Sequence, residues 1–218
     1  MTTFDGKVAL VTGASRGIGA AIAQELGSRG AAVAVNFSGS EEAALSVVSA
    51  IEGAGGRAIA LKADVGDPAS CADLVESTLR ELGGLDIVVN NAGITRDGLL
   101  VRMSDEDWSS VLDINLTGAF SVTRAAARHL MKQRSGAIVN VTSVIGLVGN
   151  AGQANYAAAK AGIIAFSKTA ALELAKHNIT VDVIAPGFTG TDMVLAMPEH
   201  VLTQVKARIP LGRLARPE

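Results

Sequence analysis

The chain has 218 residues, of which 49% are hydrophobic and 18% charged, and its formal net charge at pH 7 is −2. This length and apolar content suffice for one large core without an evident linker, and the near-balanced charge argues against general affinity for nucleic acid or membranes. No apolar segment has the length of a signal peptide core or a membrane span, so the sequence predicts a cytoplasmic protein.

The N-terminal region predicts a strand followed by a phosphate-binding turn. Residues 7–12 are typical of a buried strand, and Ile18, Ile22 and Leu26 recur every four residues, as on one face of a helix. Between them lies the run Gly13-Ala14-Ser15-Arg16-Gly17-Ile18-Gly19. Its glycines permit positive φ angles and a close approach of the backbone, and a helix N-terminus offers free N–H groups. We therefore expect the pyrophosphate of a dinucleotide to bind here.

The end of the second predicted strand indicates which dinucleotide binds. Residues 32–35 form this strand, which runs into Asn36-Phe37-Ser38. Sites for NAD(H) usually place an acid about 20 residues past the glycines, against the ribose 2′-hydroxyl. Here the next acids, Glu41 and Glu42, belong to the following helix. Arg16 is either an exposed loop cation or the partner of a 2′-phosphate, and the missing acid favours the second interpretation and NADP(H).

The remaining chain alternates between strands and helices. Asp67 and Pro68 predict a helix start, with an N-cap followed by proline at the first helical position. Such alternation predicts an α/β fold, a Rossmann-type doubly wound parallel sheet with helices on both faces. We expect residues 1–218 to form a single dinucleotide-binding and catalytic domain. The further predicted strands are 57–62, 86–89, 137–141 and 180–184, and the further helices are 68–82, 105–133 with interruptions, and 156–176.

Polar side chains follow two of these strands at the carboxyl edge of the predicted sheet. Asn90-Asn91-Ala92-Gly93 brings small residues and amides to a place where backbone can approach a flat ligand. The hydroxyl of Ser143 could bond to local backbone or hold a substrate carbonyl. Asn115 lies inside the long helical stretch, where asparagine has poor propensity. It is either a structural hydrogen-bonding residue or part of a proton relay.

Tyr156 and Lys160 are one helical turn apart and therefore share a helix face. A free phenol has a pKa near ~10, and an adjacent positive charge can lower this pKa by roughly 1–3. The pair could thus act as a proton donor near neutral pH. Such pairs also occur on ordinary solvated helix faces, so their weight comes from the other motifs.

Together these motifs resemble the short-chain dehydrogenase/reductase family over nearly the whole chain. The motifs that carry the resemblance are Thr12-Gly13-x-x-x-Gly17-x-Gly19, Asn90-Asn91-Ala92-Gly93, Asn115, Ser143, Tyr156-x-x-x-Lys160 and Pro186-Gly187. Residues 93–103 and 185–193 are similar to bacterial 3-oxoacyl-[acyl-carrier-protein] reductases, although acetoacetyl-CoA reductases and several sugar or alcohol dehydrogenases share much of them. The resemblance implies NADPH-dependent reduction of a 3-oxoacyl thioester, linked to acyl carrier protein or CoA, as in fatty acid synthesis. The alternatives are a small alcohol, sugar or other ketone as substrate, or a catalytically silent cofactor-binding regulatory protein.

The resemblance also implies roles for individual residues. Tyr156 would be the general acid, Ser143 would bind the carbonyl oxygen, Lys160 would hold the nicotinamide ribose and lower the pKa of Tyr156, and Asn115 would position a water relay. Asp64 and Val65 would contact the adenine, and Pro186, Gly187 and Thr191 the nicotinamide side. The implied cofactor-binding residues are Gly13, Ser15, Arg16, Gly17, Ile18, Gly19, Asn36, Asp64, Val65, Asn91, Ala92, Gly93, Tyr156, Lys160, Pro186, Gly187 and Thr191.

The resemblance also implies a homotetramer and a chain that continues past this point with another helix and a last strand. We therefore expect a homotetramer, a C-terminus that is incomplete at Glu218, and an unpaired sheet edge at residues 180–184. Arg124, Arg128 and Lys132 form a basic stripe on a predicted helix. This stripe is either a solvated face or, as the resemblance supports at Arg128, a landing site for an acidic acyl carrier protein.

Two other residue types are assigned no role in the chemistry. Trp108 lies in a predicted helix, where we expect it to pack. The histidines are scattered without the spacing of metal ligands, so no metal site is predicted. They are His129, His177 and His200.

Overall fold

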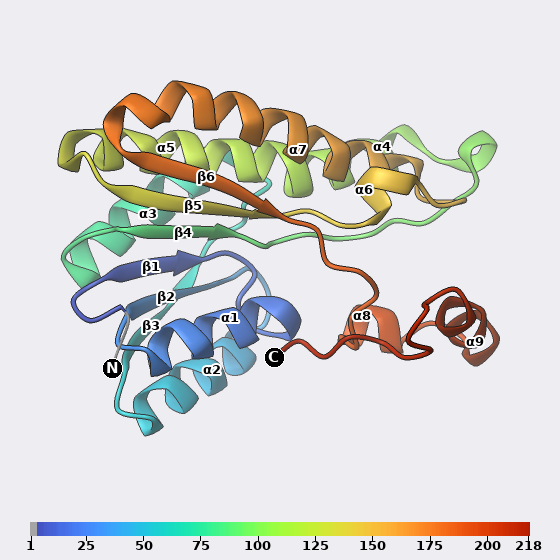
Figure 1. Ribbon diagram of the computed structural model, residues 1–218, viewed down its shortest axis with the longest axis horizontal. Helices are drawn as coiled ribbons and strands as arrows, with labels where there is room; N and C mark the ends of the chain where they lie inside the picture. The colour runs from blue at the N-terminus through green and yellow to red at the C-terminus, as the bar shows by residue number, and fades with distance from the viewer. Residues whose placement is uncertain (1–3) are drawn as a thin grey trace.

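Six parallel strands form one sheet in the computed structural model, which describes residues 4–218 (Figure 1). The strand order is β3-β2-β1-β4-β5-β6, so the chain builds outward from β1 to one edge, returns to the centre, and builds outward again. This order confirms the predicted Rossmann-type doubly wound sheet. The strands are β1 (Val8–Val11), β2 (Ala32–Phe37), β3 (Arg57–Lys62), β4 (Ile87–Asn90), β5 (Gly136–Val141) and β6 (Ile179–Ile184).

Helices cover both faces of the sheet, with α1 and α2 on one face and α3, α5 and α7 on the other (Figure 1). Among residues 4–218, no helix is long and apolar enough to cross a membrane. The helices are α1 (Gly17–Ser28), α2 (Glu41–Gly53), α3 (Pro68–Leu82), α4 (Asp105–Leu112), α5 (Gly118–Gln133), α6 (Ile145–Val148), α7 (Ala154–Leu174), α8 (Asp192–Leu195) and α9 (Glu199–Ala207). Short 3₁₀ turns occur at Leu100–Arg102 and Ala175–His177.

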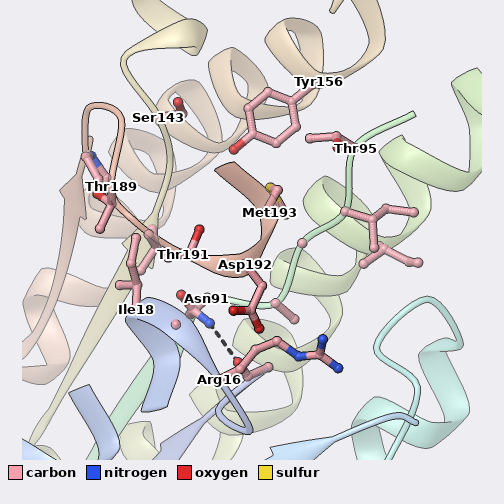
Figure 2. Close-up of a pocket in the computed structure, with 18 of the residues that line it drawn as sticks. Arg16, Ile18, Asn91, Thr95, Ser143, Tyr156, Thr189, Thr191, Asp192 and Met193 are labelled. Carbon is pink, nitrogen blue, oxygen red and sulfur yellow. Dashed lines mark hydrogen bonds between the residues drawn. The ribbon is translucent and has the colours of Figure 1, made fainter. Parts of the chain in front are cut away.

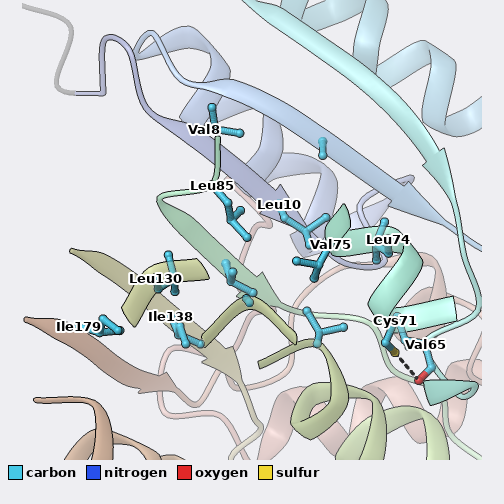
Figure 3. Packing of buried hydrophobic residues seen from close by; sticks show 14 of the residues in the cluster. Val8, Leu10, Val65, Cys71, Leu74, Val75, Leu85, Leu130, Ile138 and Ile179 are labelled. Carbon is cyan, nitrogen blue, oxygen red and sulfur yellow. Dashed lines mark hydrogen bonds between the residues drawn. The ribbon is translucent and has the colours of Figure 1, made fainter. Parts of the chain in front are cut away.

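Successive residues of a strand supply the two core layers. Leu10 packs in the layer below α3, α5 and α7, whereas Val11 packs in the layer below α1 and α2. Figure 3 shows the first layer, in which Leu10 comes from β1, Ile138 from β5 and Leu130 from α5. Because both of its faces are buried, the central strand β1 is a continuous apolar run, whereas the edge strand β6 alternates between buried and exposed residues over Ile179 to Asp182.

The predicted helix 105–133 is divided in the structure. The π-helical turn Asp113–Thr117 separates α4 from α5, and its closing bond runs from the N–H of Gly118 to the carbonyl of Asp113, five residues back. An i→i+5 turn accommodates one residue more than an α-helical turn. Asn115 lies in this turn and is 1% exposed. The interruption therefore directs a polar side chain inward from an otherwise amphipathic helix.

The segment after β6 lies beyond the carboxyl ends of the strands, where α8 and α9 project from the sheet (Figure 1). Thr189 forms an isolated parallel bridge with Ala215, which connects this segment to residues near the end of the described chain. Strand β6 is at the edge of the sheet. On α4, Trp108 is 39% exposed, so it packs only in part, and it does not line the cleft described below.

Candidate active site

A cleft of about 670 Å³ lies at the carboxyl ends of the strands, where the strand order reverses between β1 and β4. Figure 2 shows Arg16 at one end of this cleft and Tyr156 and Ser143 at the other. The predicted site residues that line it are Gly13, Ser15, Arg16, Gly17, Ile18, Asn36, Asp64, Val65, Asn91, Ala92, Gly93, Ser143, Tyr156, Lys160, Pro186, Gly187 and Thr191. Gly19 and Asn115 are not among the lining residues.

The glycine turn fits closely against the loop after β4. Gly13 has a φ of +60°, and a Cβ added to it would lie 2.8 Å from the Cα of Ala92. A Cβ on Gly19 would lie 2.5 Å from the carbonyl oxygen of Gly13. The first turn of α1 contains no acidic residue, and Arg16 at its N-cap makes no side-chain capping bond. The N–H groups at the start of α1 therefore remain available to an anion in the cleft.

Two asparagine side chains hold this turn in place. Asn36 is 2% exposed; its Oδ1 accepts from the N–H of Gly13 (3.2 Å), and its Nδ2 donates to the carbonyl of Ala63 (3.1 Å). Asn91 donates from Nδ2 to the carbonyl of Gly13 (3.1 Å). Both residues line the cleft, but these side-chain groups are committed to the backbone. Their main contribution is the shape of the phosphate-binding turn.

The Arg16 end of the cleft is rich in donors and contains no acid from the β2–α2 connection. Arg16 is exposed and donates from Nη2 to the hydroxyl of Ser40 (2.6 Å). Ser38 is also exposed and lines the cleft, whereas its neighbour Phe37 is 4% exposed and packs in the core. A guanidinium and two hydroxyls around one space are suited to a phosphate.

Tyr156 lies at the other end of the cleft, half-buried near the start of α7. Burial raises the pKa of Tyr156, hydrogen bonding with Ser143 acts in the opposite direction, and the charge of Asp97 raises the pKa further. The net direction is upward, which keeps the phenol protonated. A protonated phenol is the form that can donate a proton to a substrate oxygen.

Lys160 is 3% exposed, and its Nζ lies 5.6 Å from the centroid of the Tyr156 ring. The ammonium donates to the carbonyl of Val141 (2.9 Å), and burial lowers the pKa of Lys160 to about 8. The expectation that Lys160 lowers the pKa of Tyr156 is not met in this structure. The amine is over the ring and bonded to β5, and burial of the phenol dominates its pKa.

Ser143 makes the local backbone interaction considered for it. Its Oγ accepts from the N–H of Ile145 (3.1 Å), which makes it a local turn residue. The same side chain acts on the Tyr156 phenol and lowers its pKa, against the larger effect of burial. Ser143 and Tyr156 both line this end of the cleft, and a carbonyl oxygen placed between them would meet two O–H donors.

Asn115 makes two hydrogen bonds to one residue of the loop after β4. Its Oδ1 accepts from the N–H of Ile94 (2.8 Å), and its Nδ2 donates to the carbonyl of Ile94 (3.0 Å). A Cβ added to Gly93 would lie 3.1 Å from Asn115 Oδ1 and 3.6 Å from Lys160 Nζ. Asn115 therefore has the structural role considered for it, and only a glycine separates its amide from the lysine amine.

Two residues that the sequence did not single out fix the start of α7. Gln153 is 6% exposed, lines the cleft, and donates from Nε2 to both carboxylate oxygens of Asp97 (3.1 Å each). Asn155 is fully buried and donates to the carbonyls of Arg96 (2.9 Å) and Asp107 (3.1 Å). These bonds tie the loop after β4 and helix α4 to the turn that carries Tyr156. Their partners are distant in sequence, so no local pattern marks them.

The segment after β6 closes the cleft from the side of the glycine turn. The carbonyl of Pro186 accepts from the N–H of Val144 (3.0 Å), and a Cβ on Gly17 would lie 3.1 Å from Cγ2 of Thr191. Met193, labelled in Figure 2, adds an apolar side chain to the lining. Among residues 4–218, no group of three or more His, Cys, Asp or Glu side chains could hold a metal ion.

The chain is similar in sequence and in structure to known reductases and dehydrogenases. Residues 7–201 match the short chain dehydrogenase family. A 3-oxoacyl-[acyl-carrier-protein] reductase of Synechocystis sp. is 50% identical over 218 residues, which are 100% of this chain and 87% of that protein. The FabG reductase of the same name from Escherichia coli is 50% identical over 97% of this chain and 85% of its own. A short chain dehydrogenase from Burkholderia cenocepacia, solved in complex with NADP, has a TM-score of 0.92 and 40% identity, with coverage of 98% and 86%.

Proposed function

The chain belongs to the short chain dehydrogenase family, and we propose that it reduces 3-oxoacyl thioesters to 3-hydroxyacyl thioesters with NADPH. The observation that carries the proposal is the meeting of Tyr156, Ser143 and Lys160 at one end of a cleft whose other end is suited to phosphate. Relatives that are 50% identical are named 3-oxoacyl-[acyl-carrier-protein] reductases, which favours this substrate over a simple alcohol or sugar. A silent regulatory protein would not need the proton donor and its partners.

The cleft fits a dinucleotide phosphate at the glycine turn. Side chains at Gly13 and Gly19 would fill the space in which the turn meets the loop after β4, and the start of α1 has no acid to neutralise its N–H groups. Arg16, Ser38 and Ser40 would hold a 2′-phosphate. This donor set supports NADP(H) rather than NAD(H) as the cofactor.

The residues at the Tyr156 end would supply the proton and hold the ketone. NADPH, when bound, supplies the hydride that reduces the carbonyl carbon. The hydroxyls of Tyr156 and Ser143 donate hydrogen bonds to the carbonyl oxygen, and the proton of Tyr156 moves to that oxygen as negative charge develops on it. Lys160 retains two N–H groups besides the one bonded to Val141, and these would hold the nicotinamide ribose. Asn115 would act through the loop residue Ile94 and, as we propose, through a water relay.

The test is NADPH consumption with acetoacetyl-CoA, an acetoacetyl carrier protein and a panel of simple ketones and sugars. We expect turnover with the thioesters and much lower kcat/KM with ketones that lack a thioester. Tyr156→Phe serves as the inactive control. Turnover of sugars or simple ketones alone would support the other dehydrogenase activities, and no turnover with any substrate at saturating NADPH would support the regulatory protein.

The carrier protein and the assembly are parts of the same proposal. Arg128 is exposed on α5, as a landing site for an acidic carrier requires. Arg128→Glu should raise KM for the carrier-bound substrate in a salt-dependent way and leave acetoacetyl-CoA unaffected, and Arg80→Glu on α3 is the control. Equal effects on both substrates would assign Arg128 to a solvated face.

Assembly into a homotetramer is supported by apolar side chains on α4, α5 and α7. Trp108, Phe120 and Leu172 are 39%, 40% and 83% exposed, and burial against another copy would remove them from water. Light scattering on the 218-residue chain measures the assembly directly. A monomer at all concentrations would contradict this part of the proposal. A cytoplasmic location remains a prediction from the sequence.

A further inference from the structure

Thr142 makes a side-chain hydrogen bond to α7, the helix that carries Tyr156 and Lys160, rather than within its own turn. It follows the last residue of β5, is 3% exposed, and donates from Oγ1 to the main-chain carbonyl of Lys160 (2.6 Å). Its neighbour Val141 accepts the side-chain ammonium of the same lysine (2.9 Å). Two consecutive residues at the end of β5 therefore hold Lys160 at both ends, one at its backbone and one at its amine.

The opposite side of Lys160 is enclosed by α6. A Cβ added to Gly146 would lie 2.8 Å from the main-chain carbon of Lys160 and 2.9 Å from its Cβ, so α6 and α7 touch at backbone distance. Lys160 cannot move toward α6 without a clash. The direction in which it could move is away from β5, and the Thr142 hydroxyl is the polar contact to the main chain of Lys160 that opposes this movement.

A second tie joins the same two elements deeper in the fold. Asn140 on β5 donates from Nδ2 to the hydroxyl of Ser167 on α7 (2.8 Å). Ser167 is two helical turns beyond Lys160. With both ties present the position of α7 along β5 is fixed. Without Thr142, the remaining bonds of α7 are those of Ser167 to Asn140, of Asn155 at the start of the helix and of the Lys160 amine, and none of them holds the main chain of the Lys160 segment against β5.

We propose that Thr142 is a positioning residue, whose hydroxyl fixes the Lys160 segment of α7 against β5 so that the lysine amine and the tyrosine phenol are aligned in the cleft. The proposal deepens the function proposed above, because its readouts are NADPH binding and ketone reduction at this site. Thr142 lines the cleft, but its hydroxyl donates its proton to the carbonyl of Lys160 in α7. A small loss of alignment at reacting groups is costly, since a displacement of about 1 Å can reduce rates ~10²-fold.

The test compares Thr142→Val, which removes the hydroxyl at nearly constant volume, with Thr142→Ser, which keeps it. Thr78→Val is the matched control, because Thr78 is also fully buried and donates to a helix carbonyl (Leu74, 2.8 Å), but in α3 away from the cleft. We expect Thr142→Val to lower kcat about tenfold and weaken NADPH binding, Thr142→Ser to restore both to within about twofold of wild type, and Thr78→Val to change neither. Both valine variants should lose similar stability.

The outcomes separate positioning from a general effect on stability. Wild-type kcat and NADPH affinity in Thr142→Val would overturn the proposal, as would equal losses in Thr78→Val or a serine variant as impaired as the valine. Thr142→Ala, which adds no misplaced methyl, makes the same comparison if the valine variant does not fold. If the wild-type protein reduces no 3-oxoacyl thioester, the proposed function fails, while NADPH affinity across these variants still decides the role of Thr142.

Discussion

Replacing Lys160 by methionine should stabilise the folded protein at neutral pH while abolishing its activity. The side chain is 3% exposed, and burial lowers the pKa of Lys160 from 10.5 to about 8. At pH 7 the amine is charged in both the folded and the unfolded chain, so folding must place an ammonium in the interior. The pKa difference corresponds to a cost of about 3 kcal/mol, at 1.36 kcal/mol per pKa unit. Methionine has similar length and no such cost.

The net gain is smaller than this cost, because the carbonyl of Val141 loses the donor that Lys160 provides. A lost hydrogen bond costs about 1 kcal/mol, so we expect Lys160→Met to raise the free energy of unfolding by about 2 kcal/mol at pH 7. The sign of the pH dependence follows from proton binding. Between pH 8 and 10.5 the unfolded chain binds more protons at this site than the folded chain, so the wild type gains stability as pH rises. At pH 10 the advantage of the methionine variant should be gone.

Urea unfolding without cofactor, followed by circular dichroism at pH 7 and pH 10, measures this difference. Lys168→Met is the matched control, since Lys168 is exposed on the same helix and should show little effect at either pH. A methionine variant less stable than wild type at pH 7 would refute the reasoning. A stability difference that does not change with pH would show that the buried charge is not its source.

Three further predictions concern catalysis and the cofactor. Tyr156→Phe should reduce kcat by ~10²–10⁴ and leave the Kd for NADPH unchanged, because only the proton donor is removed; steady-state rates and fluorescence titration measure the two, and near-normal kcat would exclude Tyr156 as the acid. Ser38→Asp should weaken the binding of NADPH relative to NADH, as measured by the two Kd values, because a carboxylate at this position repels a 2′-phosphate. Ser38 is chosen instead of its neighbour Phe37 because Phe37 is buried and an acid there would disrupt the core. An unchanged ratio of the two Kd values would show that the 2′-phosphate does not bind beside Ser38. Asp97→Asn should lower the pKa of Tyr156, because the charge of Asp97 raises it, so the rate of reduction should begin to fall at a lower pH than in the wild type. The shift in the pH profile should be below about 1 pH unit because Asp97 is exposed. A shift of the profile to higher pH would contradict this effect of Asp97.

The elements of this fold are largely encoded in local patterns. Strands buried on both faces are short apolar runs such as residues 8–11, and these runs are separated by glycine turns and capped helices that a sequence displays directly. Asp67 is an example, because its carboxylate accepts from the N–H groups of Ala69 and Ser70 as its position before proline predicts. The glycine turn was likewise identifiable, since a close backbone approach requires residues without a Cβ.

What could not be predicted depends on partners distant in the chain. Asn36 has a side chain suited to a cofactor contact, but its amide donates to the carbonyls of Leu61 in β3 and of Ala63 just after it. Only the pairing of β2 with β3 brings these carbonyls to Asn36. The pKa of Tyr156 is set mainly by burial, whereas the sequence displays only the neighbouring charge of Lys160. Asn155 has the same character, because its bonds reach 48 and 59 residues back along the chain.

The π-helical turn at residues 113–117 makes the length of this segment as constrained as its composition. One residue more than an α-helical turn advances everything after it by about 100° around the helix axis. A deletion of one residue in this turn would restore a regular α-helix, in which the two sides of the turn could no longer both keep their orientation. Either Asn115 would rotate away from Ile94, or the inward face of α5 with Val122 and Leu130 would rotate away from the sheet. A substitution in this turn changes one side chain and leaves its neighbours in place, whereas an insertion or deletion reorients every residue that follows. A relative with an alignment gap between residues 113 and 117 would therefore lose either the contact of Asn115 with the loop after β4 or the packing of α5 on the sheet.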